Sequence, residues 1–416
     1  MPTYPNAVEV NAPANEVKDM DFTFTPIQEA LRQEFEYFFS KEEENAPEGW
    51  MGGMEAMFAT NEGWAYHRSA AEKLAQKGWL CLPWPKQFGG QEHSHIEQLI
   101  FNEVRAYYRV PGVDVHGPVA VAAGILEYGS EEIKREWLPR IARGEINWCE
   151  GLSEPNAGSD LASLQTRAME DGDNYVITGQ KIWTTGAHRS DHIFIVARTG
   201  PEDSRHKGLT YFLSEMNKPG ITVSPLKWMN RQHMYNEVFL DGLRVPKRNI
   251  VGEVNQGWYV TMGSRNFARA RVGSVAEAKR DLEDLVKYCR ANHVNGQFLS
   301  TNPTVRNKLA NAAIEIEAAR QWAYYVAWLQ SQGQMVAVEA AASKYFGTEL
   351  NVHLANIAIE IMSLYGPVRE TSKWAPLQGR FENLCQTSLG FTIAGGTTEI
   401  EKNVIAWQGL KLPRVR

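Results

Sequence analysis

The stretch from Trp148 to Thr185 constrains the fold of this chain more than any other part of its sequence. It opens with a turn-rich loop, GLSEPNAGSD, over residues 151–160. Glycines and hydroxyl side chains in such a loop leave backbone N–H groups free to face a ligand. The text that follows is typical of strands, at residues 164–168 and 175–179 with an Asp-Gly-Asp turn between them, and it leads into KIWTT. The pattern predicts strands that hold the loop close to Trp183.

A flat, electron-accepting heterocycle would suit this combination. Trp183 offers a face for stacking, and Ser153 and Thr185 offer hydroxyls to a polar ring edge. An ordinary β-sheet with one core tryptophan accounts for the same residues equally well. The residues alone leave both interpretations open.

Length and charge set outer limits on function. A chain of 416 residues can form two or three domains, and a formal net charge of -6 provides no global basic surface for nucleic acid. No run of 18 or more apolar residues predicts a membrane span. The first 30 residues resemble neither a signal peptide nor a transit peptide. The four cysteines lack any C-x-x-C spacing and lie far apart, at Cys81, Cys149, Cys289 and Cys385, so we expect neither a metal site nor a disulfide framework. We therefore expect a cytoplasmic protein that does not bind nucleic acid.

The character of the chain changes twice. After a polar tail over residues 1–23, helical patterns fill the sequence up to residue 147, and the first has Pro26 in its opening turn. Residues 148–250 read mainly as strands bounded by Gly, Pro and Asp. Helical spacing returns over residues 251–416, most clearly in Ala310–Gln330 and Val336–Ile361.

The string LSEPNAGSD, followed by GQKIWTTG, resembles the flavin-binding segment of the acyl-CoA dehydrogenase family. The usual text there is T-E-P-x-A-G-S-D and then G-x-K-x-W-I-T, and matching text recurs from about Phe24 to Arg414. The resemblance implies an α+β fold. It would have an all-α domain at 1–147, a middle β-domain of barrel or sandwich type at 148–250, and a four-helix-type bundle at 251–416.

The resemblance also implies FAD as the cofactor and an acyl-CoA thioester as the substrate. In this family a base removes the proton next to the carbonyl, a hydride leaves the next carbon for the flavin, and an electron-transfer flavoprotein takes the electrons. The implied FAD contacts are Leu152, Ser153, Ser159, Trp183, Thr184, Thr185, Thr397, Thr398 and Glu399. The implied acyl-CoA contacts are Ser159, Arg269 and Gly396.

The sequence departs from the family at both places where the basic glutamate is found. One position belongs to Gly395 and the other to Ala268, and neither residue can take a proton. Three explanations stay open. Another group acts as the base, for which Asp114 with His116 close behind is the candidate, although a turn residue after Pro-Gly explains Asp114 more simply. Alternatively, Ala268 is an engineered replacement, or the chain is one subunit of a heteromer.

The heteromer gains support from positions that would contact the flavin of a neighbouring subunit. An arginine there is replaced by Asn292, which removes a charge-assisted contact, and glycines are replaced by Ser363 and Leu364. We therefore expect a homo- or hetero-oligomer, dimer or tetramer. Two alternatives to desaturation remain, a half-site or non-catalytic subunit and a flavin monooxygenase on the same fold. Related branches that carry the base on the helix after the sheet, and not in the C-terminal string, often accept branched or ring-bearing acyl chains, and we favour such a substrate.

Overall fold

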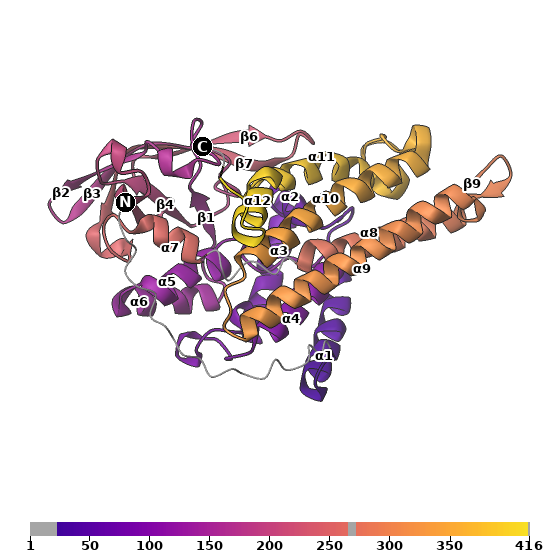
Figure 1. Cartoon of the computed structure of the whole chain (residues 1–416), viewed down its shortest axis with the longest axis horizontal. Coiled ribbons are helices and arrows are strands. Elements are labelled where there is room, and N and C mark those ends of the chain that lie inside the picture. Colours follow the sequence, from indigo (N-terminus) through magenta and orange to yellow (C-terminus); the bar gives the residue numbers. More distant parts are fainter. Residues whose placement is uncertain (1–22, 265–271, 415–416) are drawn as a thin grey trace.

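The computed structural model describes residues 23–264 and 272–414. Its first part is helical (Figure 1). The predicted start of the first helix is confirmed, because Thr25 accepts a hydrogen bond from the N–H of Gln28 and Pro26 occupies the first turn. Ser130 caps a later helix in the same way, through the N–H of Ile133. These helices are α1 (Pro26–Glu43), α2 (Gly53–Ala59), α3 (Asn61–Gln76), α4 (His95–Tyr107), α5 (Ala122–Tyr128) and α6 (Glu131–Ala142).

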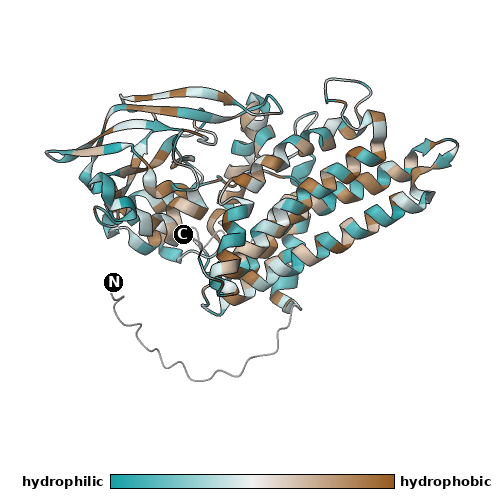
Figure 2. Ribbon diagram, turned by 45° about the horizontal axis from the view of Figure 1, so that its top comes forward, coloured by the Kyte–Doolittle hydropathy of each residue, from teal (hydrophilic) through white to brown (hydrophobic). Residues whose placement is uncertain are grey.

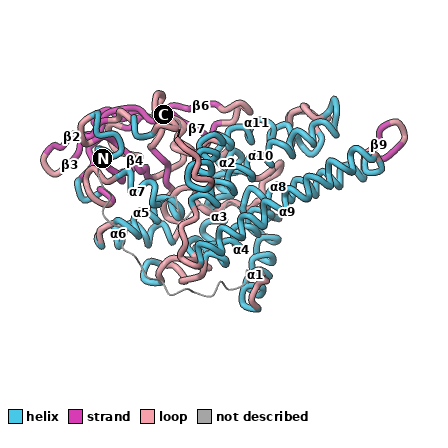
Figure 3. Tube along the Cα trace, viewed as in Figure 1, coloured by secondary structure: helices cyan, strands magenta, loops and turns pink. Residues whose placement is uncertain are grey.

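The middle part is a sheet that gathers at one end of the molecule (Figure 3). Its strands follow the order β6-β7-β3-β2-β4-β5-β8, and β1 pairs with β4 in parallel. All seven residues of β4 are buried, so this strand lies within the core. The strands are β1 (Trp148–Gly151), β2 (Arg167–Asp171), β3 (Asn174–Lys181), β4 (His192–Arg198), β5 (Leu209–Glu215), β6 (Ile221–Lys227), β7 (His233–Pro246) and β8 (Ile250–Val251).

Two strand predictions in this region were wrong at their ends. The strand expected at 164–168 begins only at Arg167, because the N–H groups of Gln165 and Thr166 donate to the carboxylate of Glu154 and not to a neighbouring strand. The strand expected to continue through KIWTT ends at Lys181. Trp183, two residues later, has a φ of 60°, which no extended strand allows.

The last part is again helical. In Figure 1 the long helices α8 and α9 run away from the sheet toward a small exposed hairpin of β9 (His293–Val294) and β10 (Gln297–Phe298). Apolar and polar residues alternate along these helices, as Figure 2 shows, so each helix has a face to bury. The helices are α7 (Gly257–Ser264), α8 (Val272–Ala291), α9 (Pro303–Ser331), α10 (Ala337–Met362), α11 (Arg380–Ile393) and α12 (Thr398–Val404). The predicted α+β arrangement of helices, sheet and helices is confirmed.

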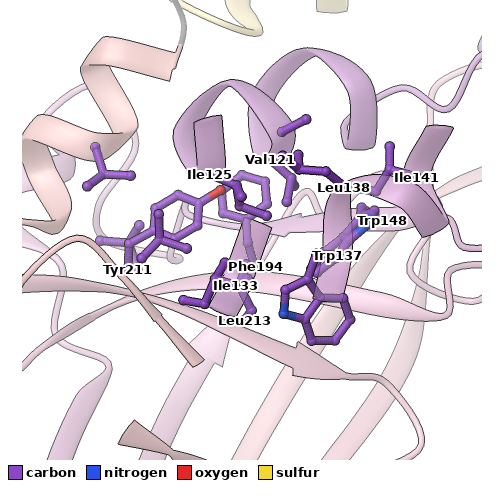
Figure 4. Packing of buried hydrophobic residues seen from close by; sticks show 14 of the residues in the cluster. Val121, Ile125, Ile133, Trp137, Leu138, Ile141, Trp148, Phe194, Tyr211 and Leu213 are labelled. Carbon is purple, nitrogen blue, oxygen red and sulfur yellow. The ribbon is translucent and has the colours of Figure 1, made fainter. Parts of the chain in front are cut away.

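Aromatic packing joins the first helices to the sheet (Figure 4). Trp137 of α6 meets Trp148 of β1 edge-on, with ring centroids 5.4 Å apart. Phe194 of β4 stacks on Tyr211 of β5 at 4.9 Å. These side chains belong to one buried cluster that also contains Leu152, so the start of the predicted flavin loop rests on this core.

A buried ionic cluster joins the first helices to the last ones. Asp281 of α8 is fully buried and accepts two hydrogen bonds of 2.9 Å from Arg380 at the start of α11. Arg109, just after α4, donates to the same carboxylate at 2.5 Å. Burial opposes the charge of Asp281, yet the two arginines lower its pKa below the usual range. Within residues 23–264 and 272–414, no helix combines the length and apolar composition that a membrane crossing needs.

Candidate active site

A buried ion pair shapes the loop that opens the site. Lys181, at the end of β3, is fully buried and donates to Glu154 at 2.8 Å and to the carbonyls of Leu152 and Val196 at 3.0 and 2.8 Å. Burial lowers the pKa of Lys181 to about 8, although the charge of Glu154 acts to raise it. All three donors of this ammonium are therefore used to hold the loop against the sheet.

Glu154 is the loop residue of this ion pair, and we call Lys181 together with Glu154 the clamp. Its carboxylate accepts from the N–H groups of Gln165 and Thr166 at 2.6 and 2.8 Å. Burial alone would raise the pKa of Glu154, but Lys181 and these donors lower it. A tight turn from Glu154 to Ala157, closed by two hydrogen bonds of 3.0 Å, follows. The sequence analysis did not predict a role for either charged residue. Lys181 lies 27 residues after Glu154, and no local pattern around the loop indicates that the two side chains form a pair.

The tryptophan turn lies directly beside this loop. The N–H of Ile182 donates to the carbonyl of Ser153 at 2.9 Å, so the structure brings Leu152, Ser153 and the turn at residues 182–186 together. Trp183 has a φ of 60° and is 53% exposed. A bulky residue in this backbone region is strained and is held there by its surroundings.

Asn236 of β7 holds the turn in place. Its carbonyl accepts from the N–H of Thr184 at 3.0 Å, and its side-chain amide donates back to the carbonyl of Thr184 at 3.0 Å. The amide also contacts His188 at 3.2 Å and His233 at 2.8 Å, two imidazoles that stack with centroids 3.8 Å apart. This network was not predicted from the sequence.

The turn has the features that a flavin ring needs. The exposed indole of Trp183 offers a flat face, and the ring of Tyr235 packs nearly perpendicular to it with the ring centroids 5.8 Å apart. The hydroxyl of Thr184 is buried without a hydrogen-bond partner among the described residues. Such an orphaned group favours a polar ligand edge at this turn. The residues present therefore fit the ring of FAD, while their contacts with it stay predictions.

Ser159 lies on the outer part of the loop. It is exposed, and a Cβ placed on the neighbouring Gly158 would meet no atom within 4 Å. Asp160 next to it pairs with Arg205 at 2.5 Å. The backbone at this point is therefore open to a ligand, which suits the predicted acyl-CoA contact of Ser159 without testing it.

The predicted pyrophosphate contacts form a separate group around α12. Thr397 caps this helix by accepting from the N–H of Ile400 at 3.2 Å, and Thr398 donates to Glu349 of α10 at 2.7 Å. The hydroxyl of Thr397 thus caps α12 and that of Thr398 joins α12 to α10, whereas Glu399 is exposed. Lys344 of α10 donates to the carbonyl of Gly396, whose φ of 103° favours glycine. In Figure 1 α12 lies near the middle of the view, between the sheet and the long helices.

The candidate base Asp114 is occupied by backbone contacts. Its Oδ2 accepts from the N–H groups of Gly117 at 2.8 Å and Trp148 at 3.0 Å. Burial raises the pKa of this carboxyl to about 6. These contacts join the first helices to β1, which is the work of a structural turn residue. The catalytic role of Asp114 stays a prediction, and this geometry does not favour it.

The remaining predicted positions include two that the structure does not describe. Ala268 and Arg269 fall outside the described residues, whereas Gly395 has a φ of 68°. The amide of Asn292 donates to the carbonyl of Tyr288 at 2.9 Å and so closes the end of α8. Ser363 and Leu364 are exposed after α10. In the described part of the chain, no group of three or more His, Cys, Asp or Glu side chains is arranged to hold a metal ion.

Comparison with known proteins identifies the family. The models of the acyl-CoA dehydrogenase N-terminal, middle and C-terminal domains match residues 25–145, 149–243 and 255–410. Acyl-CoA dehydrogenase FadE26 of Mycobacterium tuberculosis is 32% identical over 402 residues, which are 95% of this chain and 99% of that protein. Acyl-CoA dehydrogenase FadE29 of the same organism is 32% identical over 94% of this chain and 97% of its own.

Solved structures agree with these relatives. The ChsE4-ChsE5 complex from Mycobacterium tuberculosis matches with a TM-score of 0.85 at 32% identity, over 95% of this chain and 100% of the matched one. The Tcur3481-Tcur3483 steroid ACAD matches with a TM-score of 0.84 at 30% identity, over the same shares of the two chains. The chain therefore belongs to the acyl-CoA dehydrogenase family of flavoprotein oxidoreductases.

Proposed function

We propose that this chain carries out the FAD-dependent α,β-desaturation of an acyl-CoA and passes the electrons to an electron-transfer flavoprotein. The observation that carries the proposal is the turn at Trp183. This turn carries the exposed indole of Trp183 and the orphaned hydroxyl of Thr184, and a hydrogen bond from Ile182 to Ser153 joins it to the loop. A strained turn supported by a buried polar network is costly, and its maintenance fits a binding site for a flat ring.

Each part of the chain has a role in this reaction. Leu152, Ser153 and residues 183–185 would hold the flavin ring, and Ser159 would face the acyl-CoA. When bound, FAD would supply an acceptor for the hydride. The clamp of Lys181 and Glu154 fixes the loop against the sheet, so the flavin ring would bind to a surface that is already formed.

A ring-bearing acyl group is the substrate class that we propose. The support is the name of one structural relative, a steroid ACAD that is 30% identical over 95% of this chain.

A second function, a half-site subunit of a heteromeric dehydrogenase, has its own support. Two of the structural relatives are named as pairs of different chains, ChsE4-ChsE5 and Tcur3481-Tcur3483. Asn292, Ser363 and Leu364 lack the groups that would contact a neighbouring flavin. The last helices and the segment between α10 and α11 also expose large apolar side chains that a partner subunit would cover, namely Ile314, Leu364, Trp374, Leu389 and Ile393.

The test compares the unmodified chain with Ala268→Glu, both loaded with FAD, against a panel of acyl-CoAs. Desaturation by the unmodified chain supports the enzyme and places the base elsewhere. A large gain with Ala268→Glu identifies Ala268 as the place of a lost base. If neither protein bleaches its flavin with any acyl-CoA under anaerobic conditions, the desaturation proposal is wrong.

A further inference from the structure

A histidine and a glutamate meet beside the start of the flavin loop. His116 lies just before the single helical turn at Gly117–Val121, and Glu150 lies on β1. The Nδ1 atom of His116 is 3.4 Å from Oε2 of Glu150, and the side chains are 13% and 24% exposed. The pair therefore lies in a largely enclosed place where an ionic contact is only weakly screened.

The strand geometry places this pair next to the predicted ring contacts. Side chains alternate along a strand, so Glu150 shares its face with Leu152, whose Cα is roughly 7 Å farther along. Glu150 is the strand partner of Phe194, and the ring of His116 meets Phe194 edge-on at 6.4 Å. Leu152 and Phe194 belong to the same buried cluster. The imidazole and the loop thus share one side of β1.

The two nitrogens of His116 have different surroundings. Nδ1 faces the carboxylate of Glu150, which favours the tautomer that carries its proton on Nδ1. Nε2 is then the atom left to accept a proton, and it has no hydrogen-bond partner within residues 23–264 and 272–414. Asp114, the other titratable group that faces His116, uses Oδ2 for two backbone N–H groups. Nε2 of His116 is therefore a buried acceptor that no residue in the described ranges uses.

We propose that His116, oriented by Glu150, is the base of the desaturation, in place of the glutamates that are absent at Ala268 and Gly395. This inference rests on the proposed function. The α-proton of the thioester passes to Nε2, and the electron pair of the broken C–H bond forms the new double bond as the β-carbon loses a hydride. FAD, when bound, would accept that hydride and with it the two electrons that the acyl-CoA loses. The imidazolium then releases its proton to water. Glu150 is a positioning residue that stabilises the imidazolium.

The test separates proton removal from hydride transfer. Cyclohexylthioacetyl-CoA has sulfur in place of the β-carbon, so it can lose an α-proton but no hydride. The FAD-loaded full chain is mixed with this analogue in D₂O, and loss of the α-hydrogens is followed by NMR, with binding of the analogue measured in parallel. His116→Gln should slow exchange by about 100-fold or more, as expected for loss of a base. His353→Gln, which breaks the His353–Glu315 contact on the surface, is the matched control and should change nothing.

Glu150→Gln keeps the imidazole and removes only its charged partner. Exchange should fall roughly tenfold while binding of the analogue stays unchanged, because the carboxylate orients the ring and stabilises the imidazolium that forms. A merely structural contact, which the isosteric glutamine would keep, would leave exchange at the rate of the parent protein. Exchange that survives in His116→Gln to within threefold, in protein that binds the analogue, overturns the inference alone. A parent protein that binds FAD and the analogue yet exchanges nothing overturns both the inference and the desaturation proposal.

Discussion

Among single residues, Lys181 determines how the flavin loop is held. Its ammonium is buried and shared among Glu154 and two backbone carbonyls, all within 3.0 Å. A buried pair of this kind contributes little net stability compared with apolar residues, but removal of one partner leaves an uncompensated charge. The lysine is therefore expected to matter for the shape of the loop as well as for its stability.

Replacement of Lys181 by methionine should lower the free energy of unfolding by about 3–5 kcal/mol. Glu154 would remain buried without its partner, and the carbonyls of Leu152 and Val196 would lose their donor. Urea unfolding followed by circular dichroism measures the change. Lys218→Met is the control, since Lys218 pairs with Glu215 in an exposed contact that contributes at most about 1 kcal/mol. Equal losses in the two variants would contradict this account of the clamp.

A second residue-scale prediction concerns Glu277 of α8. Burial raises the pKa of this carboxyl to about 7, against the attraction of Arg380. Because the folded pKa lies above the unfolded value of 4.5, the folded chain binds the proton more tightly. The stabilisation is complete below pH 4.5 and is lost as the pH rises through 7.

Glu277→Gln should accordingly make the chain more stable at pH 8, by at most about 3 kcal/mol, and should flatten the pH dependence of stability between pH 4.5 and 7. Thermal unfolding at a series of pH values measures this. The exposed Glu253→Gln is the control and should leave the slope unchanged. A loss of stability at pH 8 in Glu277→Gln would show that the carboxylate is held by its neighbours as an ion.

Among the elements, the turn between β3 and β4 depends on β7. Asn236 is fully buried and makes two reciprocal hydrogen bonds with Thr184, 52 residues away in the sequence. The stacked imidazoles of His188 and His233 flank the same amide. The left-handed conformation of Trp183 thus depends on a neighbouring strand and not on local sequence.

Asn236→Ala should release this turn. The carbonyl of Thr184 would be left buried without its donor, at a cost of about 1–3 kcal/mol, and FAD affinity should fall roughly tenfold because the indole is no longer fixed. Flavin fluorescence titration measures the affinity. Asn249→Ala removes a comparable bond to the carbonyl of Leu213 elsewhere in the sheet and should not change FAD binding. Identical flavin affinity in the two variants would show that Asn236 has no part in positioning the turn.

The sequence correctly predicted the features that depend on residues close together in the chain. Thr25 and Pro26 mark the start of the first helix within three residues of Gln28, so this helix start was predicted correctly. The contact of Lys181 with Glu154 and the hold of Asn236 on Thr184 join distant parts of the chain, and no local pattern announces them. The end of β3 at Lys181 was predicted wrongly for the same reason. Candidate ring contacts came from the family resemblance, whereas the base could not, because both family positions lack a titratable group.

For the whole molecule, the exposed apolar residues of the last helices raise the question of assembly. Leu364 is 88% exposed, and Ile393 and Trp374 are also largely exposed. Exposed apolar groups of this size mark interaction surfaces when they gather on one face. Together with Asn292 in place of an arginine, they favour a partner subunit that supplies the other half of the flavin site.

The chain purified alone should therefore not form a homotetramer with one FAD per protomer. Light scattering gives the assembly size and flavin absorbance gives the stoichiometry. Co-expression with a second acyl-CoA dehydrogenase chain should raise the FAD content if the heteromer is correct. A saturated homotetramer of this chain would rule out the half-site subunit and leave the complete enzyme.

The proposed reaction requires a flavin that lies against the indole of Trp183, with a thioester beside it. The most direct measurement is an anaerobic titration of the FAD-loaded protein with a ring-bearing acyl-CoA, followed by the visible absorbance of the flavin. We expect the oxidised flavin band to bleach in proportion to the added acyl-CoA. Flavin that stays oxidised with every acyl-CoA, or a chain that binds no flavin either alone or with a partner, would contradict the account.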